Sequence, residues 1–426
     1  MQNLLLNHFL RLRKVSTDTR RIEPQSIFFA LKGDNFNGNL FALKALELGA
    51  AIAVVDEDVN SNDDRIIHVE DTLTSLQLLA RDYRRTLKIP FLAITGSNGK
   101  TTTKELIRDV LTKKYRVTAT IGNLNNQIGV PLTLLSIPQD CEIAVIEMGA
   151  NHQEEIKSYC QYAEPNFGMI TNIGKAHLEG FGGLEGVKKG KKELFDYINE
   201  TGGKVFVNTE LFPLDEISSR IPRIEYGFGG KDFQVNIQSE SPTLSYDYRS
   251  ATAAIIVNTN LAGAYNLYNV ASAIVIGKFF GVDEEAIHAA IREYQPGNNR
   301  SQIVPTERNT LIMDAYNANP TSTEHALVSL SKQDSPNKFF ILGDMLELGE
   351  HGPKEHRKMF EKTKELKLNG IFIGRVYADV ISEENVSVFT HRNDAEQHLS
   401  NLHLSASTIL IKGSRGMQLE KLVPVL

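Results

Sequence analysis

A loop of small and polar residues in this chain could bind phosphate. It reads Thr95-Gly96-Ser97-Asn98-Gly99-Lys100-Thr101-Thr102. Glycines let backbone N–H groups approach phosphate oxygens closely, and a helix that begins there adds a favourable dipole. The Lys100 amine would neutralise the β and γ phosphates of a nucleotide, and the Thr101 hydroxyl would bind Mg²⁺. Because Gly96 and Gly99 are closer together than in the common phosphate loop, a strand-to-helix turn without a ligand is the alternative.

A second candidate is Glu147, which follows the largely apolar run 141–146. Ligand-binding groups in doubly wound sheets gather where the strands end. A carboxylate at that edge could bind a second Mg²⁺. A surface glutamate at the end of a strand is the alternative.

The elements around these residues alternate between apolar runs and helical segments. Strands are expected at 27–31, 52–55, 91–94, 144–146 and 168–170, and helices at 40–48, at 72–88 and from Thr101. This alternation predicts a mainly parallel sheet with helices on both faces, and it places the phosphate loop between a strand and a helix. The interval 204–260 differs, because short β-like runs lie there among turn residues; helices are expected after it at 265–280 and 284–294.

Residues 295–299 read as a linker, after which the α/β pattern begins again. Further strands are expected at 310–313, 338–342, 370–373 and 407–411. The pattern predicts three α/β domains, with boundaries at 1–85, 86–295 and 296–426. A chain of 426 residues is long enough for about three domains at roughly 150 residues each.

Composition excludes several classes of function. The net charge of −6 argues against a nucleic-acid partner, which usually requires a basic surface. No apolar stretch reaches the ~18 residues of a membrane span, and the N-terminus lacks the basic start of a secretory signal. The two cysteines, Cys141 and Cys160, indicate a reducing compartment rather than a disulfide framework. We therefore expect a cytoplasmic protein that works in solution.

The phosphate loop resembles that of the Mur ligases and of the related folylpolyglutamate synthetases. Four further segments resemble family motifs in the same order along the chain: 171–178, 263–269, 314–320 and 342–349. The resemblance covers nearly the whole chain. Its most discriminating part is Tyr316-Asn317-Ala318-Asn319-Pro320, because members that add a single amino acid usually carry Asn-Pro-Arg there. The string resembles the corresponding string of the family members that add D-alanyl-D-alanine to UDP-MurNAc-tripeptide.

The resemblance implies a small α/β N-terminal domain that binds the UDP-sugar, and a central P-loop mononucleotide-binding domain with a parallel sheet. The third domain would be Rossmann-like and would bind the incoming amine substrate. ATP and two Mg²⁺ ions would be the cofactors, and the protein would be a monomer.

The resemblance also assigns the metal ligands. His177 would share the second Mg²⁺ with Glu147, although a lone histidine is more often structural. The family carries a carbamylated lysine shortly after this histidine, which selects Lys191, with Lys189 as the alternative. CO₂ addition turns an amine into an anionic carbamate that can bind metal. Basic runs of this kind are otherwise solvated helix faces. The implied metal ligands are Thr101, Glu147, His177 and Lys191, and the implied catalytic residues are Lys100, His177 and Lys191.

Other residues are assigned to the substrates by the same resemblance. Asn266 and Asn269 would approach the adenine or ribose, Arg300 and Asp314 would contact the nucleotide from the third domain, and Tyr265 replaces the histidine usual in the family. Helix capping is the alternative for both asparagines. The residues expected to bind the UDP-sugar, the sugar-peptide or the dipeptide are Thr19, Arg20, Lys32, Gly33, Phe36, Asn125, Asn126, Tyr316 and Asn319. Ordinary polar loops are the alternative for the first-domain and central-domain segments.

The implied reaction is a cytoplasmic step of peptidoglycan precursor synthesis. ATP would phosphorylate the tripeptide carboxylate, and the amine of D-Ala-D-Ala would attack the acyl phosphate. Two rival functions stay open: a Mur ligase that adds a single amino acid, and a phosphate-loop switch that only binds partners. The sequence does not identify the third residue of the tripeptide or the general base for the amine.

Overall fold

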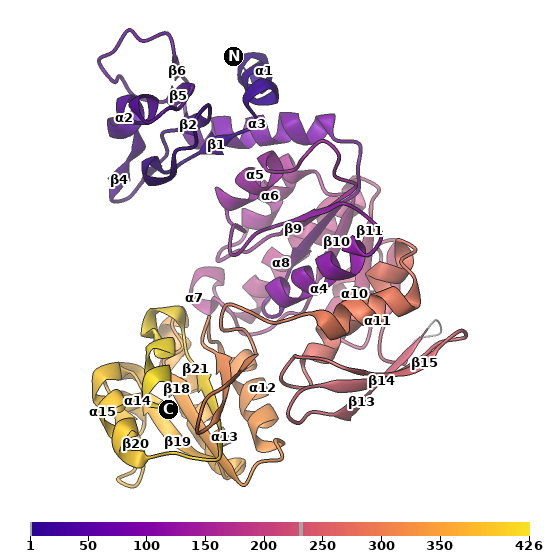
Figure 1. The fold of residues 1–426 in the computed structure, drawn as a ribbon, viewed down its shortest axis with the longest axis vertical. Coiled ribbons are helices and arrows are strands. Elements are labelled where there is room, and N and C mark those ends of the chain that lie inside the picture. The colour runs from indigo at the N-terminus through magenta and orange to yellow at the C-terminus, as the bar shows by residue number, and fades with distance from the viewer. Residues whose placement is uncertain (1, 230–232) are drawn as a thin grey trace.

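Three α/β parts follow one another along the chain in the computed structural model, which describes residues 2–229 and 233–426. The first part lies at one end of the molecule, the third part at the other, and the central part between them (Figure 1). This arrangement confirms the expected fold class of three α/β domains.

The first part is built on a parallel sheet with the strand order β1-β2-β5-β6. A small antiparallel hairpin, β3–β4, extends from it. Its elements are α1 (Gln2–Leu12), β1 (Val15–Ser16), β2 (Ile27–Phe29), β3 (Lys32–Gly33), β4 (Phe36–Asn37), α2 (Ala42–Glu47), β5 (Ile52–Val55), β6 (Ile66–His68) and α3 (Thr72–Thr86). The first helix, α1, has no counterpart among the expected elements.

Helix α3 joins the first part to the central part. The Asp71 carboxylate accepts a hydrogen bond from the Thr74 N–H at 2.6 Å, which caps the helix as its sequence predicts. Near its end, the Tyr83 hydroxyl donates to the Ile137 carbonyl at 2.6 Å and Arg84 Nε donates to the Ala163 carbonyl at 3.0 Å. These buried bonds attach the helix to the central part.

The central part contains a six-stranded sheet in the order β12-β11-β10-β7-β9-β8, with every pair parallel. The carboxyl ends of its strands therefore meet at one edge. The phosphate loop, Glu147 and the histidine segment (residues 171–178, which contain His177) lie at this edge. Its first elements are β7 (Phe91–Thr95), α4 (Lys100–Thr112), β8 (Val117–Ala119), α5 (Gly129–Leu135), β9 (Ile143–Glu147), α6 (Glu155–Ala163), β10 (Phe167–Ile170), α7 (Leu178–Phe181) and α8 (Leu184–Glu200).

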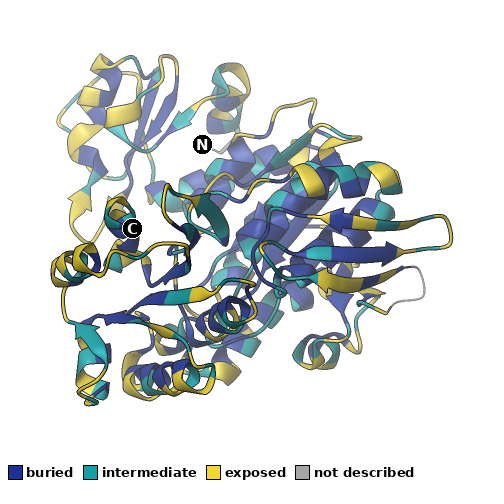
Figure 2. Ribbon diagram, turned by 60° about the horizontal axis from the view of Figure 1, so that its bottom comes forward, coloured by how far each residue is buried: buried dark blue, intermediate teal, exposed yellow. Residues whose placement is uncertain are grey.

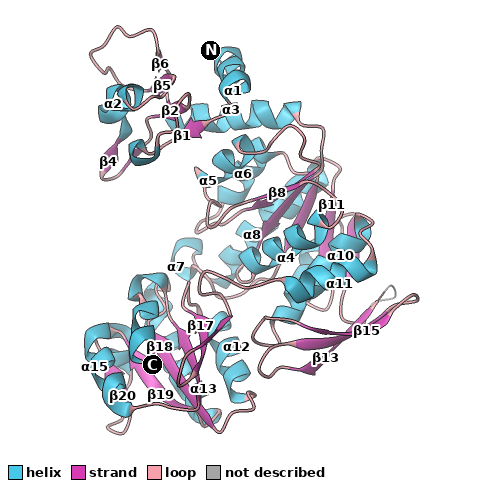
Figure 3. Ribbon diagram, viewed as in Figure 1, coloured by secondary structure: helices cyan, strands magenta, loops and turns pink. Residues whose placement is uncertain are grey.

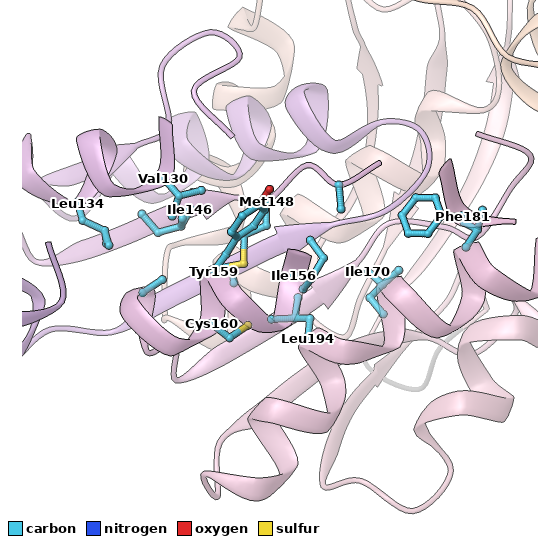
Figure 4. Packing of buried hydrophobic residues seen from close by; sticks show 14 of the residues in the cluster. Val130, Leu134, Ile146, Met148, Ile156, Tyr159, Cys160, Ile170, Phe181 and Leu194 are labelled. Carbon is cyan, nitrogen blue, oxygen red and sulfur yellow. The ribbon is translucent and has the colours of Figure 1, made fainter. Parts of the chain in front are cut away.

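Helices bury both faces of this sheet. Successive residues of β9 point to opposite faces, so that Val145 packs with the α4 side and Ile146 with the side of α5, α6 and α8. Figure 4 shows the second face, where Met148, Tyr159 and Leu194 pack between the strands and the helices. The strands are buried while many loops and outward helix faces are exposed (Figure 2). Burial on both faces explains why these strands read as continuous apolar runs.

The interval 204–260 divides between two sheets. Strands β11 (Lys204–Asn208) and β12 (Arg223–Tyr226) extend the parallel sheet, and α9 (Phe212–Ser218) connects them. The later strands form a separate antiparallel sheet, visible apart from the central strands in Figure 3. Its strands, and the two helices that follow, are β13 (Gln234–Ser239), β14 (Ser245–Arg249), β15 (Ala254–Asn258), α10 (Asn266–Phe279) and α11 (Glu284–Glu293).

The third part has a six-stranded sheet in the order β16-β17-β21-β18-β19-β20, in which only the β16–β17 pair is antiparallel among the described strands. Its strands are β16 (Gln302–Pro305), β17 (Thr310–Asp314), β18 (Asn337–Gly343), β19 (Asn369–Ile373), β20 (Ser387–Phe389) and β21 (Ser407–Lys412). Its α-helices are α12 (Pro320–Ser331), α13 (Gly352–Glu365), α14 (Arg375–Val380) and α15 (Arg392–Leu402).

Within the residues that the structure describes, none of the helices combines the length and apolar character needed to cross a membrane.

Candidate active site

The phosphate loop follows β7 directly and begins α4. Gly96 and Gly99 have φ angles of +143° and +78°, which residues with a side chain rarely adopt. A Cβ at Gly96 would lie 2.0 Å from the Thr171 hydroxyl oxygen, and one at Gly99 would lie 2.6 Å from the Asn269 amide oxygen. Only glycine fits at both positions, so the loop keeps its backbone open to a ligand.

Lys100 folds its side chain back over this loop. Its Nζ donates to the Gly96 carbonyl at 2.7 Å and to the Ser97 carbonyl at 3.3 Å. Burial lowers the pKa of Lys100, and the nearby Glu147 carboxylate opposes that effect. A phosphate oxygen at the loop would offer this amine a stronger partner than the two carbonyls.

Glu147 ends β9 beside the loop. Its Oε1 accepts hydrogen bonds from the Thr101 hydroxyl at 3.1 Å and from the Asn125 amide at 2.7 Å. Its Oε2 is buried without a hydrogen-bond donor among the described residues, and the nearest cation is Lys104 Nζ at 3.6 Å. A buried carboxylate oxygen with free acceptor capacity fits a divalent cation, which prefers oxygen ligands.

Lys191 lies on α8 with only 1% of its surface exposed. Its Nζ donates to the Ala150 carbonyl at 3.2 Å and sits 4.9 Å from the centre of the Phe181 ring. Burial, followed by the nearby charge of Lys100, holds the pKa of Lys191 well below its ordinary value. An amine in this setting favours the neutral form that can add CO₂. The alternative, Lys189, is exposed.

The third part contributes an ion pair and a cation–π contact to the site. Lys412 Nζ lies 2.6 Å from Asp314 Oδ2, at the carboxyl ends of β21 and β17. The Arg300 guanidinium stands 3.5 Å from the centre of the Tyr316 ring. The Asn319 side chain reaches the phosphate loop, where its amide donates to Asn98 Oδ1 at 2.7 Å. The discriminating string of the third part therefore touches the loop that would hold the nucleotide.

Asn266 and Asn269 are buried at the start of α10. The Asn269 amide oxygen accepts a hydrogen bond from the Thr103 hydroxyl at 3.0 Å, and its amide donates to Asn266 Oδ1 at 2.7 Å. Asn266 in turn donates to the Ala262 carbonyl at 2.7 Å. These bonds fasten α10 to α4, so part of the hydrogen-bonding capacity of both amides is already used within the protein.

One cavity of about 430 Å³ brings most of the predicted residues together. The predicted residues in its wall are Ser97, Asn98, Gly99, Lys100, Thr101, Thr102, Asn125, Asn126, Glu147, His177, Asn266, Asn269, Arg300, Asp314, Tyr316 and Asn319. Gly96 lies in the same loop, and Lys191 is bonded to Ala150 in the cavity wall. Within the described residues, no group of three His, Cys, Asp or Glu side chains forms a metal site. A metal here would therefore need other ligands, such as phosphate oxygens.

The first-part residues lie outside this cavity. Arg20 pairs with Asp18 at 2.7 Å, Lys32 pairs with Asp56 at 3.2 Å, and Phe36 stacks on Phe41 with ring centres 5.3 Å apart. Thr19 and Gly33 occupy a short 3₁₀ helix and the β3–β4 hairpin. Their assignment to the UDP-sugar stays a prediction.

Three family models match successive parts of the chain. The Mur ligase family catalytic domain matches residues 11–84, the Mur ligase middle domain matches 94–277, and the Mur ligase glutamate ligase domain matches 299–415. The UDP-N-acetylmuramoyl-tripeptide–D-alanyl-D-alanine ligase of Bacillus subtilis (strain 168) is 35% identical over 425 residues, covering 96% of this chain and 92% of that protein. The chain belongs to the Mur ligase family.

Two solved structures support the same assignment for the fold. MurF from Acinetobacter baumannii superposes with a TM-score of 0.88 at 29% identity, covering 97% of this chain and 93% of its own. The MurF ligase from Thermotoga maritima in complex with ADP superposes with a TM-score of 0.87 at 25% identity, covering 99% of this chain and 97% of its own. The family resemblance expected from the motifs is confirmed.

Two residues of this Mur ligase site were not predicted. Lys104 is buried beside Glu147, one turn of α4 after the phosphate-loop lysine. Glu347 comes from the third part and lines the cavity, where its Oε2 lies 2.7 Å from His177 Nδ1. The helical spacing of Lys104 from Lys100 could have pointed to the first. The second lies in the segment 342–349, which resembles a family motif, but its contact with His177 joins two domains and could not be read from a local pattern.

Proposed function

We propose that this chain uses ATP to join D-alanyl-D-alanine to UDP-N-acetylmuramoyl-tripeptide, in the cytoplasm and as a monomer. The single observation that carries the proposal is the contact between Asn319 and Asn98, because it brings the string 316–320 against the phosphate loop. Relatives with the D-alanyl-D-alanine ligase name align along nearly the whole chain. The proposed products are the UDP-linked pentapeptide, ADP and phosphate.

The first chemical step is phosphoryl transfer. A carboxylate acylates poorly because oxide is a poor leaving group, so the γ-phosphoryl group of ATP moves to the terminal carboxylate of the tripeptide. Lys100 leaves its carbonyl partners and stabilises negative charge on the transferring group. Arg300, beside Tyr316, approaches the same charge from the third part.

The second step forms the amide. The amine of D-Ala-D-Ala attacks the acyl carbon, the C–N bond forms, and phosphate leaves with the electrons of the broken C–O bond. An acyl phosphate hydrolyses readily, so the site must exclude water. Contacts between the third part and the phosphate loop serve that purpose, since they cover the loop from the side of the amine substrate.

The residues present fit two divalent cations. Thr101 and Glu147 would hold one beside the nucleotide, and Glu147, His177 and a carbamate on Lys191 would hold the other. Support comes from the unpaired Glu147 Oε2 and from the burial of the Lys191 amine, which holds its pKa well below the ordinary value. When bound, the ions would neutralise phosphate charge and orient the reacting carboxylate.

The test is a substrate panel scored by product mass. The purified chain is given ATP, Mg²⁺ and UDP-MurNAc-tripeptide with either D-Ala-D-Ala or one of several single amino acids. We expect a product with the mass of tripeptide plus dipeptide minus water, and phosphate release only when both substrates are present. Lys100→Ala should abolish both signals, whereas Lys189→Ala, at an exposed position, should leave them intact.

Two outcomes would replace the proposal. Product with a single amino acid, and none with the dipeptide, would make the chain a different Mur ligase. Phosphate release from ATP alone, without product from any amine, would favour a nucleotide switch.

A further inference from the structure

The third part places a carboxylate against His177. Glu347 Oε2 lies 2.7 Å from His177 Nδ1, and the Glu347 side chain is about half exposed toward the cavity. The two residues belong to different domains, since Glu347 follows β18 and His177 follows β10.

The backbone on both sides supports this contact. The Glu179 N–H donates to the Glu347 carbonyl at 3.4 Å, and a Cβ placed at Gly349 would lie 3.1 Å from the Glu179 side chain. His177 and Glu347 have φ angles of +52° and +68°, a region that residues with side chains rarely adopt. Such conformations persist where surrounding structure holds them, and they gather at functional sites. The two turns are therefore shaped to meet.

The position of the carboxylate decides which histidine nitrogen is free. A carboxylate near Nδ1 favours the tautomer with the proton on Nδ1, which leaves the lone pair of Nε2 for a metal. In this structure the contact is at ion-pair distance, and Nδ1 makes no hydrogen bond with any described residue.

We propose that Glu347 is a positioning residue for His177: the third domain supplies the carboxylate that fixes the tautomer and orientation of the imidazole. The inference rests on the proposed function, in which His177 binds the second divalent cation. It adds that the third domain, which also carries the string 316–320, supplies the partner that positions His177, a metal ligand of the central domain.

The experiment measures metal binding without turnover. Mn²⁺ is titrated into the full-length chain with ADP, and free Mn²⁺ is followed by electron paramagnetic resonance. We expect Glu347→Ala to weaken the second Mn²⁺ site by about 10–100-fold, as is typical when the outer partner of a metal-bound histidine is removed. Glu347→Gln should recover part of the affinity, because its amide oxygen can still accept a hydrogen bond from the His177 Nδ1–H group. It also keeps the size of the side chain.

The matched control is Glu350→Ala, which removes an exposed glutamate from the same turn. It should bind Mn²⁺ like the wild type. An equal loss in Glu350→Ala would show that general charge in the turn, not the contact with His177, sets the affinity, and would overturn the inference.

His177→Ala separates this inference from the proposed function. If His177→Ala loses the second Mn²⁺ and Glu347→Ala does not, the positioning role is wrong while the metal assignment stands. If His177→Ala binds both ions normally, the metal assignment in the proposed function fails, and the inference fails with it.

Discussion

In the described part of the chain, three buried lysines lie at or beside this site, and two of them are paired with a carboxylate. Lys104 lies 3.6 Å from Glu147, and Lys412 lies 2.6 Å from Asp314. Among the described residues, no carboxylate lies within ion-pair distance of Lys191, which meets only a carbonyl and an aromatic ring. An unpaired charge is costly to bury, whereas a neutral amine is tolerated. The contrast singles out Lys191 as the lysine available for reaction with CO₂.

Lys191 should leave a signature in the pH dependence of stability. Its pKa is depressed in the folded chain, so between that value and 10.5 the unfolded chain binds a proton that the folded chain does not. The free energy of unfolding should therefore rise with pH in this window, by up to about 1.4 kcal/mol per pH unit relative to Lys191→Met. The measurement is urea unfolding of both proteins from pH 7 to pH 10.5 in CO₂-free buffer without metal.

Lys189→Met is the matched control for this prediction. Lys189 is exposed on the same helix, and its replacement should leave the wild-type slope in place. Parallel curves for the wild type and Lys191→Met would mean that the buried amine stays charged, contrary to the expectation.

The residues of the phosphate loop could be predicted because their chemistry is local. A strand, two glycines, a lysine and a threonine lie within one short segment, and the structure places that segment at the cavity. His177 and Lys191 were reached only through the family resemblance, since a lone histidine and a basic run usually have ordinary roles. The resemblance selected Lys191 over Lys189, and the burial of Lys191 next to an exposed Lys189 is consistent with that choice.

At the scale of elements, α8 is shaped to pack against α7. Gly186 and Gly190 lie one helical turn apart on the same face of α8, and both face Phe181. A Cβ at Gly186 would lie 1.8 Å from the Phe181 carbonyl oxygen, and one at Gly190 would lie 2.5 Å from its ring. This close approach fixes the ring beside which Lys191 Nζ lies.

Alanine at either glycine should therefore destabilise the protein, although alanine favours helix by about 1 kcal/mol. We expect Gly186→Ala and Gly190→Ala to lower the free energy of unfolding by about 1–3 kcal/mol, because the added methyl overpacks the α7–α8 contact. Thermal unfolding of each variant, compared with the wild type, measures the effect.

Gly352→Ala provides the control at the start of α13. A Cβ there meets nothing within 4 Å, so this change should be neutral or stabilising by up to about 1 kcal/mol. Equal stability of all three variants would show that the contact of α8 with Phe181 accommodates the added methyl group at little cost in stability, contrary to the prediction.

The elements around the phosphate loop were predicted from their local pattern, whereas helix α1 and the pairing of distant strands were not. The strand at 91–94 occurs within one residue of its expected ends, and the helix that follows begins one residue before the expected Thr101. The β-like runs of 204–260 were recognised, but their division between a parallel and an antiparallel sheet depends on partners far along the chain. A short apolar run does not specify which strand lies beside it.

At the scale of the whole molecule, the central and third parts meet around the histidine segment. The Lys175 N–H donates to the Thr321 hydroxyl at 3.1 Å, and Lys175 Nζ lies 2.7 Å from Glu355 Oε1. Glu355 is nearly buried on α13, and Lys175 comes just before His177. This ion pair therefore holds the third part against the segment that carries the proposed metal ligand.

Reversing one charge of this pair should weaken the contact between the central part and the third part. We expect Lys175→Glu or Glu355→Lys to lower kcat/KM at least about tenfold, because two like charges would face each other at a nearly buried position. The double variant restores opposite charges and should recover most of that loss, which steady-state kinetics and small-angle scattering can measure together. Lys358, 3.2 Å from Glu355, would attract the glutamate introduced at position 175 but would repel the lysine introduced at position 355. If the two single losses multiply in the double variant, the two residues act independently, and the pair does not hold the domains together.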